Sequence, residues 1–255
     1  MFNPLEQFEI HILFIINILG LKILYTNATM YLSLSLGIIL FIYFFYLSQS
    51  KMIPTTTQYV FESIYMLVYD MCKQQIGIKS QEFFSMIFTY FIFILILNLL
   101  GLTPYGFTVT SHISFTFVLG FSSWFAITLI GLMKHKLNFF KLFLPSGSPI
   151  FLIPLLVLIE IVSYISRTFS LSIRLFANMM SGHTLLFILS SFVTKILFLK
   201  NAVMAFPLTI LPAIPVVIVV SLVSILELGI AFLQAYVFVV LICIYLNDSY
   251  NAGSH

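Results

Sequence analysis

The sequence predicts an all-α integral membrane protein, and its composition and segment lengths carry that prediction. Of the 255 residues, 61% are hydrophobic and only 7% are charged. A soluble domain of this size has about 25% charged residues, so most of this surface must face lipid. Several segments without charge reach about 20 residues, enough to cross a bilayer core as a helix. We expect residues 1–255 to form a single polytopic membrane domain with one N-terminal span, an amphipathic helix, a helical hairpin and two long apolar helical segments.

The same composition argues against several classes of protein. A net charge of +3 is too small for a nucleic-acid surface, so we expect no nucleic-acid partner. Cys72 and Cys243 lie far apart with no His beside either, and we interpret them as membrane-embedded thiols rather than zinc ligands or a disulfide framework. No Gly-rich loop with a Lys is present to cradle phosphate. We therefore expect no bound nucleotide, metal or other cofactor.

The first 47 residues contain one span. The start of the chain carries Glu6 and Glu9, whereas signal peptides begin basic and mitochondrial transit peptides are Arg-rich and acid-poor. The apolar run Ile10–Leu21 is too short to span, and we expect it at the membrane interface. Ala28–Leu47 has no charge and a spanning length, so it is the predicted first span.

Pro54–Gln75 has a different pattern. Apolar and polar residues recur there at helical spacing on two different sides, which predicts an amphipathic helix along the membrane surface or against a partner. A short packed connector helix is an equally good interpretation. The apolar side has Val60, Ile64, Leu67, Val68 and Met71, and the polar side has Gln58, Glu62, Asp70 and Lys73.

A helical hairpin is predicted over residues 83–133. Its spans are Phe83–Leu102 and Ile113–Met133, joined by a turn at Thr103–Gly106, and a second turn is expected at Leu144–Pro149. The connecting loop has no Lys or Arg, but lysines flank the pair on both sides: Lys51, Lys73, Lys79, Lys134, Lys136 and Lys141. The positive-inside rule places these lysines on the matrix or cytoplasmic side and the N-terminus on the other side.

The segment Ile150–Leu199 is too long for one upright helix, since 50 helical residues span about 75 Å and the bilayer core about 30 Å. Either two short spans flank a loop around Arg167–Arg174, or one steeply tilted helix keeps both arginines in the membrane. Charge counting favours the loop. Polar residues at steps of three or four favour the helix, although small polar residues also serve helix packing. They are Glu160, Ser163, Arg167, Ser170, Arg174, Asn178 and Ser181.

The last apolar segment, Val203–Leu246, carries a second polar stripe made of Ser221, Ser224, Glu227 and Gln234. If this helix folds back antiparallel on the previous one, facing residues have position numbers with a nearly constant sum. Arg174 then faces Gln234, His183 faces Glu227, and the turn falls near residue 204. The polar residues of the two segments are therefore expected to meet.

These polar residues have two kinds of chemistry. Arg174 stays protonated at any working pH, so it can lower the pKa of a nearby carboxyl and block a continuous proton wire. His183 and Glu227 can hold and release a proton, although a lone membrane His is more often a packing residue. Glu160 is a candidate for a second, separate proton path, or alternatively a salt-bridge partner of Arg167.

Two C-terminal motifs resemble a known family, subunit a of the F-type ATP synthases. They are Ser172–His183, which reads SIRLFANMMSGH, and Leu226–Phe238, which reads LELGIAFLQAYVF. The hairpin motif Asn98–Tyr105 and the start Asn3–Ile10 are also similar to that family. His183 and Glu227 stand in the order that mitochondrial members tend to have, exchanged relative to many bacterial members.

The resemblance implies a proton-conducting stator subunit that is not catalytic alone, with two long, steeply tilted membrane helices. It implies that Arg174 faces a ring of c subunits, with Asn178 and Gln234 as its polar neighbours. His183 and Glu227 would line a half-channel from the outer side, and Glu160 the exit toward the matrix. A secondary polar stripe accompanies them: Ser163, Arg167, Ser170, Ser181, Ser221 and Ser224.

The resemblance also implies partners and a location. The partners are the c-subunit ring, other membrane and peripheral-stalk subunits of the ATP synthase, and the lipid bilayer. The location is the mitochondrial inner membrane, with the N-terminus in the intermembrane space and the C-terminus in the matrix. Two rival functions are a self-contained ion carrier, which often shows internal repeats, and a passive assembly protein whose polar stripes only pack helices.

Overall fold

α-Helices make up most of the described chain. The computed structural model describes residues 6–18, 21–49, 51, 53–77, 80–103, 106–136, 139, 152–197 and 206–250. Within these residues the helices are α1 (Asn27–Gln49), α2 (Thr56–Ile76), α3 (Ser80–Gly101), α4 (Ile113–His135), α5 (Ile153–Leu197) and α6 (Phe206–Tyr250). Short 3₁₀ turns are η1 (Glu6–Phe8) and η3 (Val109–Ser111). Among the described residues, every helix except α2 is long and apolar enough to cross a membrane, so the predicted all-α membrane fold is confirmed.

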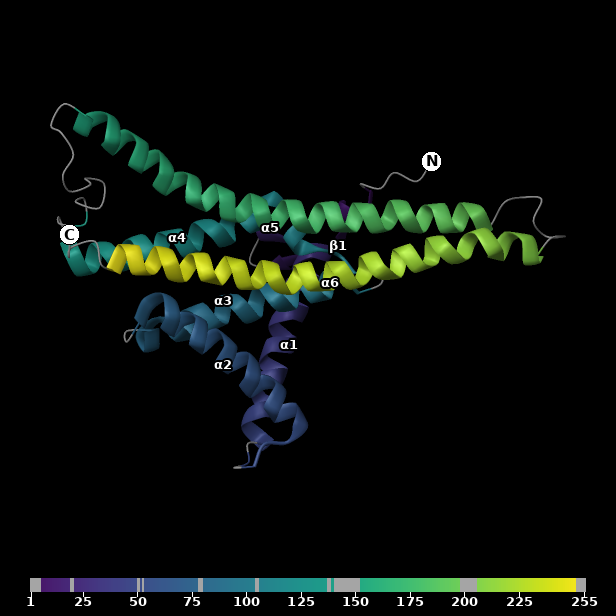
Figure 1. The fold of residues 1–255 in the computed structure, drawn as a ribbon, viewed down its shortest axis with the longest axis horizontal. Helices are drawn as coiled ribbons and strands as arrows, with labels where there is room; N and C mark the ends of the chain where they lie inside the picture. The colour runs from purple at the N-terminus through teal and green to yellow at the C-terminus, as the bar shows by residue number, and fades with distance from the viewer. Residues whose placement is uncertain are drawn as a thin grey trace.

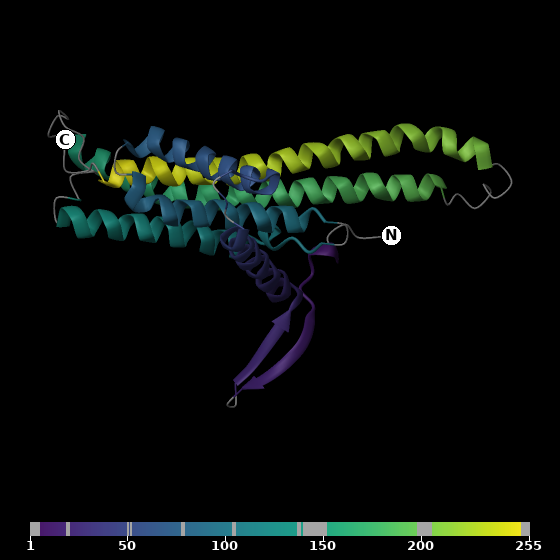
Figure 2. The same cartoon turned by 90° about the horizontal axis from the view of Figure 1, so that it is seen from below.

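The two longest helices of the described chain are α5 and α6. Each has 45 residues and is therefore about 68 Å long, more than twice the bilayer core of about 30 Å. They run side by side and antiparallel (Figure 1). α2, α3 and α4 cover the part of this pair nearer the C-terminus, and the other part extends beyond them (Figures 1 and 2). That second part therefore has its sides open to lipid or to a partner.

The continuity of α5 decides between the two interpretations of its sequence. Residues 167–174 are helical throughout, so the loop interpretation is wrong. The loop was favoured by charge counting alone, whereas the three-to-four-residue spacing of the polar side chains requires a helix. The predicted turns at Leu144–Pro149 and near residue 204 lie outside the described residues, and the turn at Thr103–Gly106 lies partly outside them.

The main core lies where α2, α3, α4, α5 and α6 meet. It consists of apolar side chains, among them Phe91, Ile127, Leu175, Phe238 and Ile242. Small residues let the helices approach closely, as is common in membranes. A Cβ at Gly120 of α4 would collide with the Ser172 hydroxyl of α5, and one at Gly131 would collide with Ser249 of α6.

α2 packs as a connector on one side. Val68, Met71 and Cys72 are buried against α3 and α6, as the connector interpretation predicts. Elsewhere α2 exposes apolar side chains, including Tyr59, Val60 and Met66. α2 thus has one face in the bundle and one available to the membrane surface or a neighbouring subunit.

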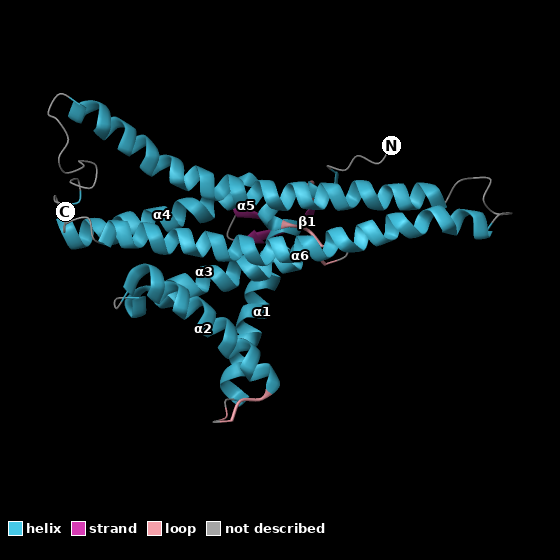
Figure 3. Cartoon of the chain, viewed as in Figure 1, coloured by secondary structure: helices cyan, strands magenta, loops and turns pink. Residues whose placement is uncertain are grey.

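A β-hairpin precedes α1, where the sequence predicted only an interfacial apolar run. β1 (Ile12–Ile18) pairs antiparallel with β2 (Leu21–Thr26) (Figure 3). The hairpin projects away from the helices (Figure 2). A short apolar run rich in β-branched residues fits a strand as well as a helix, and periodicity alone does not separate the two. The sequence analysis therefore treated this run as too short to span a membrane, but it did not predict that the run forms a strand.

Candidate functional site

The polar side chains of α5 and α6 fall into separate groups along the helix pair. We call Gly182, His183 and Glu227 the histidine group, and Asn178 with Gln234 the amide pair. Glu160, Arg167, Tyr245 and Asp248 form the arginine–aspartate group. Arg174 lies between the amide pair and the arginine–aspartate group on α5. The order along the helices is therefore histidine group, amide pair, Arg174, arginine–aspartate group.

The histidine group has buried polar atoms without partners. Glu227 is 6% exposed, and neither of its carboxylate oxygens has a hydrogen-bond partner among the described residues, nor does Nε2 of His183. Glu227 fits there because residue 182 is glycine: a Cβ on Gly182 would lie only 3.0 Å from Oε1 of Glu227. Unpaired buried polar groups are costly and rare, so this group is a candidate for proton exchange.

The amide pair joins the two helices directly. Nδ2 of Asn178 donates a hydrogen bond to Oε1 of Gln234 at 2.8 Å, which confirms the antiparallel pairing of the two segments. Gln234 bonds to Asn178, one helical turn from Arg174. The other expected pair agrees with the structure, because Glu227 lies over Gly182, the residue before His183. Gln234 is 3% exposed, and its Nε2 has no partner among the described residues.

Arg174 is exposed at the side of α5. Among the described residues its guanidinium makes no hydrogen bond and no ion pair. A membrane Arg is costly unless it faces protein or water. The exposed charge therefore needs water or a further polar group beside it, beyond the hydrogen bonds and ion pairs of the described residues.

The arginine–aspartate group links α5 to the end of α6. Nη1 of Arg167 lies 3.5 Å from Oδ2 of Asp248, and Nη2 lies 3.9 Å from Oε1 of Glu160. The guanidinium carbon also lies 5.2 Å from the ring centre of Tyr245. The side chains of Glu160 and Asp248 are 39% and 47% exposed, so these ion pairs contribute less than about 1 kcal/mol to stability. The alternative interpretation of Glu160, an ion pair with Arg167, fits this geometry.

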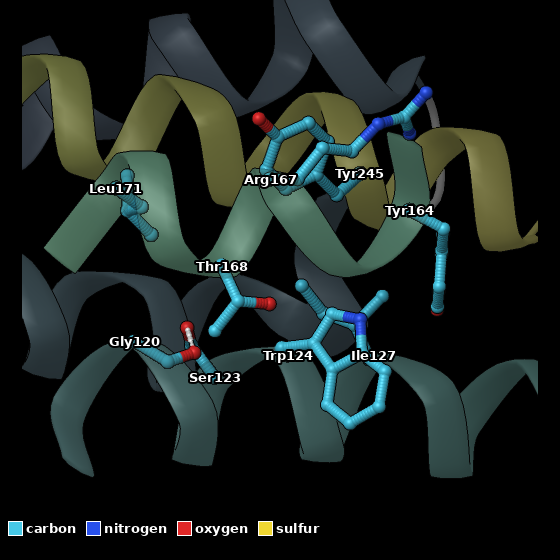
Figure 4. A pocket seen from close by; sticks show the side chains of 9 residues that line it. All are labelled: Gly120, Ser123, Trp124, Ile127, Tyr164, Arg167, Thr168, Leu171 and Tyr245. Carbon is cyan, nitrogen blue, oxygen red and sulfur yellow. Dashed lines mark hydrogen bonds between the residues drawn. The ribbon is translucent and has the colours of Figure 1, made fainter. Parts of the chain in front are cut away.

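A small cavity adjoins this group between α4, α5 and α6. Figure 4 shows the side chains that line it: Gly120, Ser123, Trp124, Ile127, Tyr164, Arg167, Thr168, Leu171 and Tyr245. Two buried polar atoms of this lining, Nε1 of Trp124 and Oγ1 of Thr168, have no partner among the described residues. The space is about the size of one water molecule.

The serines of the secondary stripe have a simpler role. The hydroxyls of Ser181, Ser221 and Ser224 donate to carbonyls three residues earlier on their own helices. Ser163 is half-buried and Ser170 exposed, and neither side chain makes a hydrogen bond among the described residues. The serines therefore fit the packing interpretation of these small residues. No three metal-ligating side chains gather in the described part of the chain.

Several site residues were missed from the sequence. Asp248 lies just beyond the predicted end of the last segment, so its pairing with Arg167 was not expected. Gly182 matters only because Glu227 occupies the space above it, which no sequence pattern indicates. Asn98 of α3 was noted only as part of a motif, yet it is fully buried and donates from Nδ2 to the carbonyl of Ala231 at 3.3 Å.

Comparison with known proteins places the chain in a family. The family model described as "ATP synthase A chain" matches residues 28–247. The chain is 47% identical over 253 residues to "ATP synthase subunit a" of Acanthamoeba castellanii, covering 99% of each chain. It is 46% identical over 246 residues to "ATP synthase subunit a" of Chondrus crispus, covering 96% of this chain and 95% of the relative. The chain therefore belongs to the ATP synthase A chain family, and it is a non-catalytic, proton-translocating membrane subunit.

Proposed function

We propose that this chain provides two offset half-channels that load and unload protons on the carboxylates of a rotating c-subunit ring. The observation that carries the proposal is the buried, unpartnered Glu227 beside His183, separated by Arg174 from the arginine–aspartate group. Along α5, His183 is about 14 Å from Arg174, and Glu160 is about 21 Å from it on the other side. Two sets of proton-exchanging groups thus lie on opposite sides of a fixed positive charge.

The first half-channel leads inward past His183 and Glu227. Both side chains can exchange protons, and their unpartnered atoms leave acceptor positions for an arriving proton or water. A carboxylate on a c subunit would be neutralised near the amide pair, Asn178 and Gln234. A neutral carboxyl can then move into lipid, whereas a charged one could do so only at high cost.

The surface that meets the ring is the side of the α5–α6 pair that the other helices leave uncovered. It exposes Arg174 together with large apolar side chains on both helices: Ile173, Leu185, Leu222, Ile225, Leu226 and Leu233. The other helices leave this side of the pair free (Figures 1 and 2). An apolar face that carries the Arg174 cation suits a partner whose lipid-facing surface carries one carboxylate at a time.

The second half-channel leads out past Glu160, Arg167 and Asp248. After nearly a full turn of the ring, Arg174 favours the ionised form of an arriving carboxyl, which releases its proton. This end of the molecule also carries Lys134 at the end of α4. By the positive-inside rule, this end of the molecule faces the matrix side of the mitochondrial inner membrane, and the N-terminal end of α1 faces the intermembrane space.

The remaining helices belong to the same membrane domain as α5 and α6. We propose that residues 1–255 form one membrane domain, in which the exposed side of α2 lies at the membrane surface against other membrane and peripheral-stalk subunits.

Each proton that crosses 100 mV supplies about 2.3 kcal/mol. Several protons must therefore pass for each ATP made, which a ring with several carboxylates accomplishes in successive steps.

The test compares two carboxylates in the assembled ATP synthase. Glu227→Gln removes the proton-exchanging group of the histidine group but keeps its shape, while Glu82→Gln changes an exposed carboxylate at the start of α3. ATP-driven proton pumping into vesicles is measured together with the amount of assembled complex. We expect Glu227→Gln to assemble and to lose most of its pumping, and Glu82→Gln to behave as wild type.

Two measurements separate the rival functions from the half-channel proposal. A passive assembly protein predicts that Glu227→Gln loses pumping only in proportion to lost assembly. A self-contained carrier predicts proton transport by the purified chain in vesicles without a c ring. Either result would overturn the half-channel proposal.

A further inference from the structure

Two thiols far apart in the sequence meet where α2 packs on α6. The Sγ atoms of Cys72 and Cys243 lie 3.8 Å apart, and both side chains are fully buried. They are the chain's two cysteines. They are 171 positions apart in the sequence, and packing of the two helices brings them together.

We propose that Cys72 and Cys243 are an oxidisable pair, a modification site at which a small neutral peroxide converts the two thiols into a disulfide that joins α2 to α6. A disulfide has an S–S distance of about 2.05 Å, so each sulfur must move by about 0.9 Å. A movement of this size is within reach of small side-chain rotations and does not require the helices to separate.

The surroundings of the pair select the oxidant. Apolar side chains of the main core enclose both sulfurs, including Val68, Val239 and Leu246. A charged or bulky oxidant such as glutathione disulfide cannot enter such a space without opening the core. Hydrogen peroxide is neutral and close to water in size, so it can reach a thiol through fluctuations that admit a single small molecule.

The reaction proceeds in two balanced steps. The hydrogen bond with Cys243 lowers the pKa of Cys72, with burial opposing this effect, so we assign the attacking thiolate to Cys72. Its sulfur attacks one peroxide oxygen and the O–O bond breaks, which gives a sulfenic acid and hydroxide. The hydroxide takes up the proton that the Cys72 thiol released and becomes water. The Cys243 sulfur then attacks the Cys72 sulfur, the S–O bond breaks, and a second water leaves as the disulfide forms. Two electrons pass from the sulfurs to the peroxide oxygens.

The disulfide would fasten α2 to the helix that carries Glu227 and Gln234. Cys243 lies nine residues after Gln234 on α6, about 14 Å along the helix axis. The modification therefore acts on the packing of α2 and leaves the proton-exchanging side chains chemically unchanged. This inference is independent of the half-channel proposal, because it depends only on the contact between the two thiols.

The experiment counts free thiols after peroxide treatment of the intact complex. The complex is treated with hydrogen peroxide, quenched with catalase, unfolded in detergent and labelled with a polyethylene-glycol maleimide that adds mass to each free thiol. We expect the label to fall from two per chain to none, without a lasting one-label species. Dithiothreitol should restore both labels, and mass spectrometry should find the peptides around residues 72 and 243 joined.

Single variants test the assigned order of attack. Cys72→Ser should keep its one label at the same peroxide dose, because Cys243 then lacks its reacting partner. Cys243→Ser should accumulate a sulfenic acid at Cys72 that dimedone traps. The proposal is overturned if both labels persist at doses that oxidise added glutathione, if one label is lost alone, or if dithiothreitol restores neither. Should a variant fail to assemble, the label count and joined peptides of the wild type still decide.

Discussion

The substitution Gly182→Ala tests whether the position of the Glu227 carboxylate matters for proton movement. The added Cβ would lie 3.0 Å from Oε1, 3.2 Å from Cδ and 3.4 Å from Cγ of Glu227. At these distances the neighbour must give by a few tenths of an ångström, so the carboxylate must shift by about that much. A misplacement of about 1 Å can cost up to about 100-fold in a positioned reaction. We expect ATP-driven proton pumping to fall several-fold, by up to about 10-fold.

The assay measures proton pumping by fluorescence quenching in vesicles that hold equal amounts of assembled complex. Gly37→Ala is the matched control, because it makes the same change in a membrane helix where a Cβ meets nothing within 4 Å. A second test combines Gly182→Ala with Glu227→Asp, whose side chain is shorter by one methylene. The double variant should pump better than the product of the two single effects predicts.

Two results would refute this reasoning. Gly182→Ala could pump as well as Gly37→Ala, which would mean that the carboxylate position does not limit proton transfer. Alternatively, the effects of Gly182→Ala and Glu227→Asp could multiply independently, which would mean that the glycine acts elsewhere than on Glu227.

Three further predictions follow from the packing. Asn178→Ala leaves buried Gln234 without its hydrogen bond and should destabilise the α5–α6 contact by about 1–3 kcal/mol, seen as a lower midpoint of thermal inactivation; an unchanged midpoint would contradict it. Gly120→Ala should reduce assembly because its Cβ meets the Ser172 hydroxyl, and Ser172→Ala should restore most of the assembly, since the nearest remaining atoms are the Thr168 carbonyl oxygen at 3.3 Å and the Cβ of residue 172 at 3.5 Å; failure of this rescue would show that another contact dominates. Burial lowers the pKa of His112 below its ordinary 6.5, so below pH 6.5 the unfolded chain binds a proton more readily than the folded chain does. The contribution of His112 to the free energy of unfolding is therefore fully present above pH 6.5 and falls as the pH drops below it. His112→Gln should therefore reduce the difference in thermal midpoint between about one pH unit above and one below 6.5, and an unaltered difference would argue against this.

Helix positions could be predicted closely because membrane segments are fixed by length and charge. The predicted first span, Ala28–Leu47, corresponds to α1 at Asn27–Gln49, and the long segments 150–199 and 203–246 to α5 and α6. The end of α6 was placed four residues too early, because hydropathy falls at Asn247 and Asp248 while the helix continues to Tyr250. That small error hid the partner of Arg167.

The contacts within the candidate site were less predictable. The constant-sum argument gave the antiparallel pairing of α5 and α6, and its pairing of His183 with Glu227 agrees with the position of Glu227 over Gly182. It opposed Gln234 to Arg174 where the hydrogen bond goes to Asn178, because side chains lean toward the helix N-terminus and their lengths differ. The meeting of Cys72 with Cys243 depends on how α2 packs on α6, and a single sequence holds no periodic signal for such a contact.

The central claim is that Arg174 separates two half-channels, and Arg174→Ala in the assembled complex tests it most directly. ATP-driven proton pumping and passive proton leak are recorded separately in vesicles that contain equal amounts of complex. The account predicts normal assembly with pumping abolished, with or without an added leak, because no fixed charge would then strip protons from the ring or keep the two paths apart. Pumping at the wild-type rate would contradict the account and leave Arg174 without a role in proton transfer.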